Sequence, residues 1–140
     1  MKSTAAPQSQ APVITPSDPA ASRRFALEAA RLAANTRCND VNILTMTGLL
    51  PVTDYFVIAT GSSARQMRTV CDELAELAIQ HGLKSFRRSG YEGDSWIVVD
   101  FVDVVVHLFS PDARRYYDLD NLWGDAPKVA WQEEKKESTN

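Results

Sequence analysis

The chain is 140 residues long, carries a formal net charge of −3 and is 44% hydrophobic. This length predicts one domain with one apolar core. The acidic balance argues against a DNA-binding protein, since gripping a phosphate backbone needs clustered Lys and Arg. We expect neither a signal peptide nor a membrane anchor, because no early segment is apolar enough. Cys38 and Cys71 have no other metal-ligating residues near them in the sequence. We expect both to be buried, reduced thiols, as is typical of a cytoplasmic protein.

The two ends of the chain differ in composition from the part between them. Residues 1–17 hold three prolines among Ala, Ser, Gln and Thr without apolar periodicity, which is typical of a disordered tail. Residues 125–140 are expected to be mostly disordered as well, because they end in a charged and polar run. A single domain is therefore predicted over residues 18–124. Whether Trp131 docks back onto that domain stays open.

Periodicity and turn residues predict eight elements in the order α-β-β-α-β-β-β-α. They cover, in chain order, residues 19–35, 40–47, 54–60, 64–80, 84–88, 96–100, 103–109 and 112–117. Asp18 before Pro19 is a good helix N-cap, with Ser22 as the alternative cap. His81-Gly82 is a good helix stop, and Asp112 is the expected cap of the last helix.

The order of these elements predicts an α/β fold with a mixed sheet of about five strands and helices packed against it. A strand, a helix and a strand within residues 54–88 predict one parallel crossover. The two apolar strands that follow predict an antiparallel hairpin, and the strand at residues 84–88 is charged enough to lie at a sheet edge.

This hairpin is the most informative part of the chain. If Phe101 and Val102 form its turn, Asp100 lies opposite Asp103, and alternation gives the hairpin two different faces. One face is wholly apolar: Ile97, Val99, Val104 and Val106. The other carries two acids, an indole and an imidazole: Trp96, Asp100, Asp103 and His107. Like charges opposite each other repel, so we expect a cation to meet them: an arginine of this chain, a metal or a partner.

Three acids suggest one chemical alternative. Asp54, Asp100 and Asp103 could hold Mg²⁺ in a nucleotidyltransferase, provided that they converge on one pocket. The spacing argues against this activity, because the last two acids are three residues apart and lie far downstream of Gly61-Ser62. We therefore expect no enzyme, no metal and no cofactor. The two aspartates could also merely flank a turn.

Other polar residues in this region admit an ordinary explanation. His107 is expected to be stacked and hydrogen-bonded beside Trp96. The segment Arg114–Tyr117 could contact phosphate or an acidic surface. Alternatively, one of its arginines could neutralise Asp100 and Asp103.

Four segments stand out by their sequence. They read TDYFVIATGSSARQ at 53–66, GYEGDSWIVVD at 90–100, DVVVHLF at 103–109 and RRYYDLDNLW at 114–123. Together they resemble one family, the Iojap-like ribosomal silencing factors. Two positions depart from the family pattern. Ser89 stands where many members have Glu, and Val102 stands where many have Gly.

The resemblance implies a fold related to nucleotidyltransferases but without their activity. It implies binding to the fourteenth protein of the large ribosomal subunit, on the face that meets the small subunit. A bound factor would then block subunit joining and lower translation, especially when nutrients run short. Members are also implied to form homodimers. A plain oligomerisation module without a ribosomal target is the remaining alternative.

Ribosomal proteins are generally basic, so an acidic face with aromatic anchors is the expected complement. On this view Trp96 is the expected hot spot, and no membrane or small-molecule substrate is involved. The expected partner-binding residues are Glu92, Asp94, Trp96, Asp100, Asp103, His107, Arg114 and Tyr117.

Overall fold

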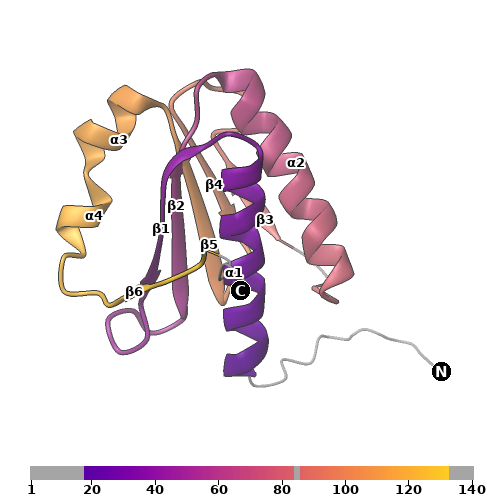
Figure 1. Ribbon diagram of the computed structural model, residues 1–140, viewed down its shortest axis with the longest axis vertical. Coiled ribbons are helices and arrows are strands. Elements are labelled where there is room, and N and C mark those ends of the chain that lie inside the picture. Colours follow the sequence, from indigo (N-terminus) through magenta and orange to yellow (C-terminus); the bar gives the residue numbers. More distant parts are fainter. Residues whose placement is uncertain (1–17, 84–85, 133–140) are drawn as a thin grey trace, which may run out of the picture.

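The computed structural model describes residues 18–83 and 86–132. Six strands form one mixed sheet in the order β3-β4-β5-β2-β1-β6, with helices on both faces (Figure 1). In chain order the elements are α1 (Pro19–Asn35), β1 (Asn39–Thr45), β2 (Tyr55–Thr60), α2 (Ala64–Gln80), β3 (Arg87–Ser89), β4 (Trp96–Asp100), β5 (Val104–Phe109), α3 (Pro111–Tyr117), α4 (Leu119–Leu122) and β6 (Lys128–Val129). The predicted mixed α/β fold is confirmed, with six strands in place of about five.

The centre of the sheet is its one parallel pair among the described strands, β2 beside β5. Every other neighbouring pair is antiparallel. β3 therefore runs in the same direction as β2, as the crossover predicted, but β5 and β4 lie between them. None of the described helices is long and apolar enough to cross a membrane.

Local capping explains where the helices begin. The Asp18 side chain accepts a hydrogen bond from the Ala20 N–H at 3.1 Å, and α1 has the predicted bounds. The Ser63 hydroxyl oxygen accepts one from the Gln66 N–H at 3.0 Å at the start of α2, which also has the predicted bounds. The predicted cap of the last helix is wrong. Ser110 caps α3.

Two apolar clusters sandwich the sheet. α1 and α2 cover one face over a large core that includes Phe25, Leu74, Ile97, Val99 and Val106. The shorter α3 and α4 lie on the other face over a second cluster that includes Phe56, Val105, Phe109, Ala113 and Leu119 (Figure 1). Both cysteines are free and buried, as predicted, and burial raises the pKa of the Cys38 thiol to about 11.

The register of the β4–β5 hairpin differs from the prediction. Trp96 lies opposite Phe109 and Asp100 opposite Val105, so the turn residues are Val102 and Asp103 rather than Phe101 and Val102. Phe101 cannot serve as a turn residue because its ring is buried. Val102 takes the turn's positive φ, +76°, which is strained for a β-branched residue.

The ordered chain extends past the expected boundary at residue 124. β6 pairs with β1, which adds the sixth strand. Trp131 docks back: its indole N–H donates to the Val41 carbonyl at 2.8 Å, and its own carbonyl accepts from Arg31 Nε at 2.7 Å. The prediction that residues 125–140 fall outside the domain is therefore wrong up to residue 132, while residues 1–17 and 133–140 lie outside the described chain. The expected strand at 84–88 corresponds to β3, Arg87–Ser89, and residues 84 and 85 of that prediction lie outside the described residues.

Candidate partner-binding site

An aromatic stack marks one end of the hairpin. Trp96 begins β4, and its ring lies 4.8 Å from the Phe109 ring and 4.6 Å from the Tyr117 ring, between centroids. Phe109 ends β5 directly opposite, and α3 folds back from it to bring Tyr117 over the indole. Trp96 is half-buried and Tyr117 is 45% exposed. The stack therefore fixes a large aromatic surface at the edge of the second core.

His107 lies inside this stack and is 6% exposed. The Trp96 indole N–H donates to His107 Nδ1 at 3.2 Å, so the neutral ring carries its proton on Nε2. Nε2 has no hydrogen-bond partner among the described residues. Burial lowers the pKa of this imidazole to about 4, because a charged ring would lose its hydration. The expectation of a stacked, hydrogen-bonded His107 is confirmed, and its role is to hold Trp96.

A shallow acidic hollow adjoins the stack. It has a volume of about 540 Å³ and is lined by Asp94, Ser95, Ser110, Asp112, Ala113, Tyr116 and Tyr117. Tyr116 is 82% exposed, and its ring meets Tyr117 edge-on at 4.9 Å. We call the surface formed by Asp94, Trp96, Asp112, Tyr116 and Tyr117 the tryptophan patch. It offers two carboxylates and three aromatic rings on one side of the molecule.

The loop between β3 and β4 is held in place from α2. It carries Glu92 and Asp94, both exposed. The Tyr91 hydroxyl lies 3.0 Å from both carboxylate oxygens of Asp72, and the Arg88 guanidinium lies 4.0 Å from the centroid of the Tyr91 ring. These contacts fix the loop from which Asp94 reaches the tryptophan patch.

The two turn aspartates do not join the tryptophan patch. Asp100 ends β4, where its carboxylate accepts a hydrogen bond from the Val102 N–H at 2.8 Å and lies on the strand position opposite Arg87. Asp103 lines a cavity on the α1 side of the sheet. The expected single acidic face is therefore wrong. Moving the turn by one residue separates the two acids. Of the four residues of the predicted polar face, His107 is buried in the second core, and Trp96, Asp100 and Asp103 are partly exposed.

Arg114 serves the interior rather than an open surface. Its Nε and Nη2 donate to the two oxygens of Asp120 at 2.9 and 3.1 Å, and its Nη1 donates to Thr60 Oγ1 at 2.7 Å. Burial alone would raise the pKa of Asp120, but the hydrogen bonds from Arg114 and Asn42 outweigh it and lower that pKa. Arg114 thus anchors α3 and α4 to the sheet, and Arg115 pairs with Asp112. These pairings differ from the alternative in which one of the two arginines neutralises the turn aspartates.

The acids of the alternative nucleotidyltransferase site do not converge. Asp54 lines a hollow with the β1–β2 loop, and Asp103 lines a different cavity. In the described part of the chain, no three His, Cys, Asp or Glu side chains gather as a possible metal site. At Gly61-Ser62 the N–H of Ser62 already donates to Gln66 Oε1 at 2.6 Å, which fits helix capping rather than an anion site.

Sequence reasoning missed several residues of this region. Phe109 and Phe56, which pack around His107, were assigned only to strands. Asp112 was expected to cap a helix, but it lines the acidic hollow and pairs with Arg115. With the observed turn, strand alternation places Phe109 on the same face as Trp96 and His107, so its place in the stack could have been predicted from the sequence. No local signal placed Asp112 beside Asp94.

A scan of family models matches residues 19–140 to the family described as ribosomal silencing factor during starvation. The chain belongs to the ribosomal silencing factor family. It is 40% identical over 106 residues to ribosomal silencing factor RsfS of Halalkalibacterium halodurans, covering 73% of this chain and 91% of the relative. It is 39% identical to RsfS of Bacillus subtilis, covering 71% of this chain and 84% of the relative.

More distant relatives and solved structures agree with this membership. The chloroplastic protein Iojap of Arabidopsis thaliana is 31% identical, with 86% of this chain and 50% of that protein covered. A crystal structure from Bacillus halodurans aligns with a TM-score of 0.63 at 34% identity, over 77% of this chain and 95% of the other. One from Chromobacterium violaceum aligns with a TM-score of 0.68 at 29% identity, over 77% and 88%. The resemblance read from the sequence is confirmed.

Proposed function

We propose that this silencing factor acts without chemistry. It docks on the large ribosomal subunit through its fourteenth protein, prevents the small subunit from joining, and so represses translation in the cytoplasm when nutrients run short. Its family membership supports a role on the ribosome. The choice of subunit, ribosomal protein and mechanism is part of the proposal. A steric block needs only a well-complemented contact surface of about 1,000 Å² or more.

One observation supports the tryptophan patch as the docking surface. Along β4, Ile97 and Val99 are fully buried by the α2 side, whereas Trp96 and Val98 on the other side are only partly buried. An indole held rigid by His107 and Phe109, yet still accessible, has the character of an interface hot spot. Tyr117 beside it adds a second aromatic anchor with few rotatable bonds.

The charges of the patch favour a basic partner. Asp94 and Asp112 line the hollow next to Tyr116, and both carboxylates are exposed. Asp112 already pairs with Arg115, so Asp94 is the main carboxylate left for a basic partner. A lysine or arginine of a ribosomal protein that enters the hollow would meet these carboxylates and the faces of the tyrosine rings. Because the two acids are exposed, they contribute more to association rate and partner choice than to raw affinity.

Co-sedimentation with purified ribosomal subunits tests the proposal. We expect the protein to pellet with free large subunits and to lower the yield of joined ribosomes when small subunits are added. Asp94→Lys should weaken pelleting by reversing a charge in the patch. Glu76→Lys, an equal change at an exposed position of α2, should leave pelleting unchanged. No pelleting with large subunits would defeat the proposal.

A cross-linking experiment tests the named partner. A photoreactive residue at Tyr116, which is 82% exposed, should cross-link to the fourteenth protein of the large subunit. A cross-link to a different ribosomal protein would support docking on the ribosome but would rule out the fourteenth protein as the partner. A cross-link between two copies of this chain would instead make the patch a homodimer interface, which the family resemblance also allows.

A further inference from the structure

Two tyrosine rings meet at a right angle beside the acidic hollow. The ring centroids of Tyr116 and Tyr117 are 4.9 Å apart, and the angle between the ring planes is 90°. Both residues line the hollow and are exposed. Trp96 packs on Tyr117 with a centroid distance of 4.6 Å, which supports the inner ring. We call the accessible angle between Tyr116 and Tyr117 the aromatic corner.

The geometry of the aromatic corner suits a compact cation. A positive charge is attracted to the face of an aromatic ring when it lies within about 6 Å of the ring centroid. Because the two centroids are close and the planes are perpendicular, one group in the corner can lie that near to both rings. A planar guanidinium stacks flat on one ring and cannot stack on a second ring at a right angle to it. A roughly spherical ammonium group can contact both.

The charges around the aromatic corner agree with a cationic ligand. Asp94 lines the same hollow and is exposed, and no ion pair of its carboxylate is found in the described part of the chain. Asp112 is already paired with Arg115. Among the described residues, the one cation found over an aromatic ring is Arg88, above Tyr91. The corner is therefore accessible to a cation from outside, with Asp94 as its counter-charge.

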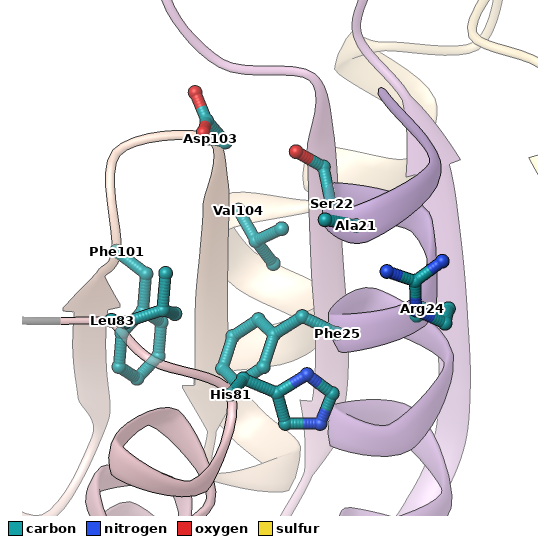
Figure 2. A pocket seen from close by; sticks show the side chains of 9 residues that line it. All are labelled: Ala21, Ser22, Arg24, Phe25, His81, Leu83, Phe101, Asp103 and Val104. Carbon is teal, nitrogen blue, oxygen red and sulfur yellow. The ribbon is translucent and has the colours of Figure 1, made fainter. Parts of the chain in front are cut away.

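A buried pair of rings shows why exposure and charge matter as well as ring geometry. Phe25 and Phe101 also meet edge to face, with centroids 4.9 Å apart, and they line a cavity of about 100 Å³ on the α1 side of the sheet (Figure 2). Both rings are buried, so a cation would lose its hydration there. Arg24 and Asp103 line that cavity with opposite charges, which gives it no preference for a further cation.

Hydration decides which ammonium group the aromatic corner prefers. The ammonium of an unmodified lysine is strongly hydrated, and two ring faces replace little of that hydration. Methylation keeps the positive charge, removes N–H groups that need hydrogen bonds, and places apolar surface against the rings. Aromatic cages that recognise methylated lysine use the same attraction. A methylated ammonium group is thus the best match to the two rings.

We propose that the aromatic corner binds a methylated lysine side chain of the docking partner, with Asp94 as the counter-charge. This inference rests on the proposed docking through the tryptophan patch and names the group that the patch recognises. The hollow is shallow, whereas a site for a free small molecule usually buries most of its ligand. A side chain delivered by a docked protein does not need such enclosure, because the rest of the interface contributes to binding.

Titration of the isolated protein with tetramethylammonium chloride tests the aromatic corner without a ribosome. We expect saturable NMR shifts of the Tyr116 and Tyr117 ring signals that sodium chloride at the same ionic strength does not produce. N-acetyl-trimethyllysine amide should bind about fivefold more tightly than N-acetyl-lysine amide. Equal binding of the two amides, or tetramethylammonium shifts no larger than those in sodium chloride, would overturn the proposal.

Two variants of Tyr116 separate the aromatic face from general hydrophobicity. Tyr116→Phe keeps the ring and should bind tetramethylammonium as the parent protein does. Tyr116→Leu keeps an apolar side chain without a ring and should bind about fivefold more weakly. Because Tyr116 is 82% exposed, both variants should fold. The same affinity in the two variants would count against the corner.

The source of the ammonium group is tested on the ribosome. A photoreactive residue in place of Ser95, which lines the hollow, should cross-link to a peptide in which mass spectrometry finds a methylated lysine. A cross-linked peptide without methylated lysine would overturn this inference and leave ribosome docking intact. Failure of the parent protein to pellet with large subunits would instead defeat the proposed function and, with it, the methylated partner.

Discussion

The two faces of β4 have different surroundings although they belong to one five-residue strand. Ile97 and Val99 are fully buried on the side covered by α1 and α2, which are 17 residues long. Trp96 and Val98 are only partly buried on the side where the covering helices have seven and four residues. Both faces carry large apolar side chains, so the presence of hydrophobic residues alone does not separate core from interface. The length of the covering helix does.

The largest expected loss of stability comes from a substitution on the fully buried face of β4. Ile97→Ala should lower the free energy of unfolding by about 3 kcal/mol, because it removes buried methylenes and leaves a cavity under α2. Urea denaturation measures this loss. Val98→Ala, a truncation smaller by one carbon on the half-covered face, should cost less than half as much. Equal losses would mean that the two faces are equally packed.

The pH dependence of stability probes the other face through His107. Its pKa is about 4 in the folded state, against an ordinary value of 6.5 for histidine, so between these two pH values the unfolded chain binds more protons. Stability contributed by the neutral ring is therefore complete above pH 6.5 and falls as the pH drops to 4, by about 3 kcal/mol at most. His107→Gln should flatten this dependence in denaturation curves taken across that range. A parent protein equally stable at pH 4.5 and pH 7 would contradict this expectation.

The anchor of the short helices should have an intermediate effect. Asp120→Asn weakens the contact of Arg114 with α4, and we expect a loss of about 2 kcal/mol in unfolding free energy. The lowered pKa of Asp120 means that its contribution is present above pH 4 and is lost as the pH falls below that value. Asp125→Asn, at an exposed residue, is the control, and similar losses in both variants would exclude a specific role for the anchor.

The smallest expected effect is a gain at the turn that both faces share. Val102 has a φ of +76° and is 55% exposed, so its side chain stabilises little while its backbone is strained. Val102→Gly should raise the free energy of unfolding by about 1 kcal/mol. Val52→Gly, at another exposed loop valine for which no positive φ is found, should give no gain. A destabilised V102G protein would show that the valine side chain contributes to the fold.

Much of the fold follows from local signals in the sequence. The bounds of α1 and α2 were predictable because caps and apolar periodicity agree at Asp18 and along Ala64–Gln80. The apolar face of Ile97 and Val99 was predictable from strand alternation. These elements depend on residues close together in the chain.

Apart from the α3 cap, which is a local error, the wrong predictions depend on contacts between distant segments. The hairpin register is set by the burial of Phe101 against Phe25 and Phe86. No local sequence pattern predicts these two contacts. The burial of His107 depends on where α3 folds back. β6 has only two residues, and its strand character comes from pairing with β1. The candidate site was thus half predictable: Asp94, Trp96 and Tyr117 come together, and the turn acids lie elsewhere.

The parallel pairing of β2 with β5 also has a consequence for biosynthesis. Tyr55 lies beside Val104, so the middle of the sheet joins segments about fifty residues apart, and β6 completes the edge only near the end of the chain. Such nonlocal pairing gives a high contact order and slow folding. While a ribosome is still making this chain, the edge of β2 that pairs with β5 stays unpaired until β5 has been synthesised. This protein therefore completes its sheet only once its own synthesis is nearly finished.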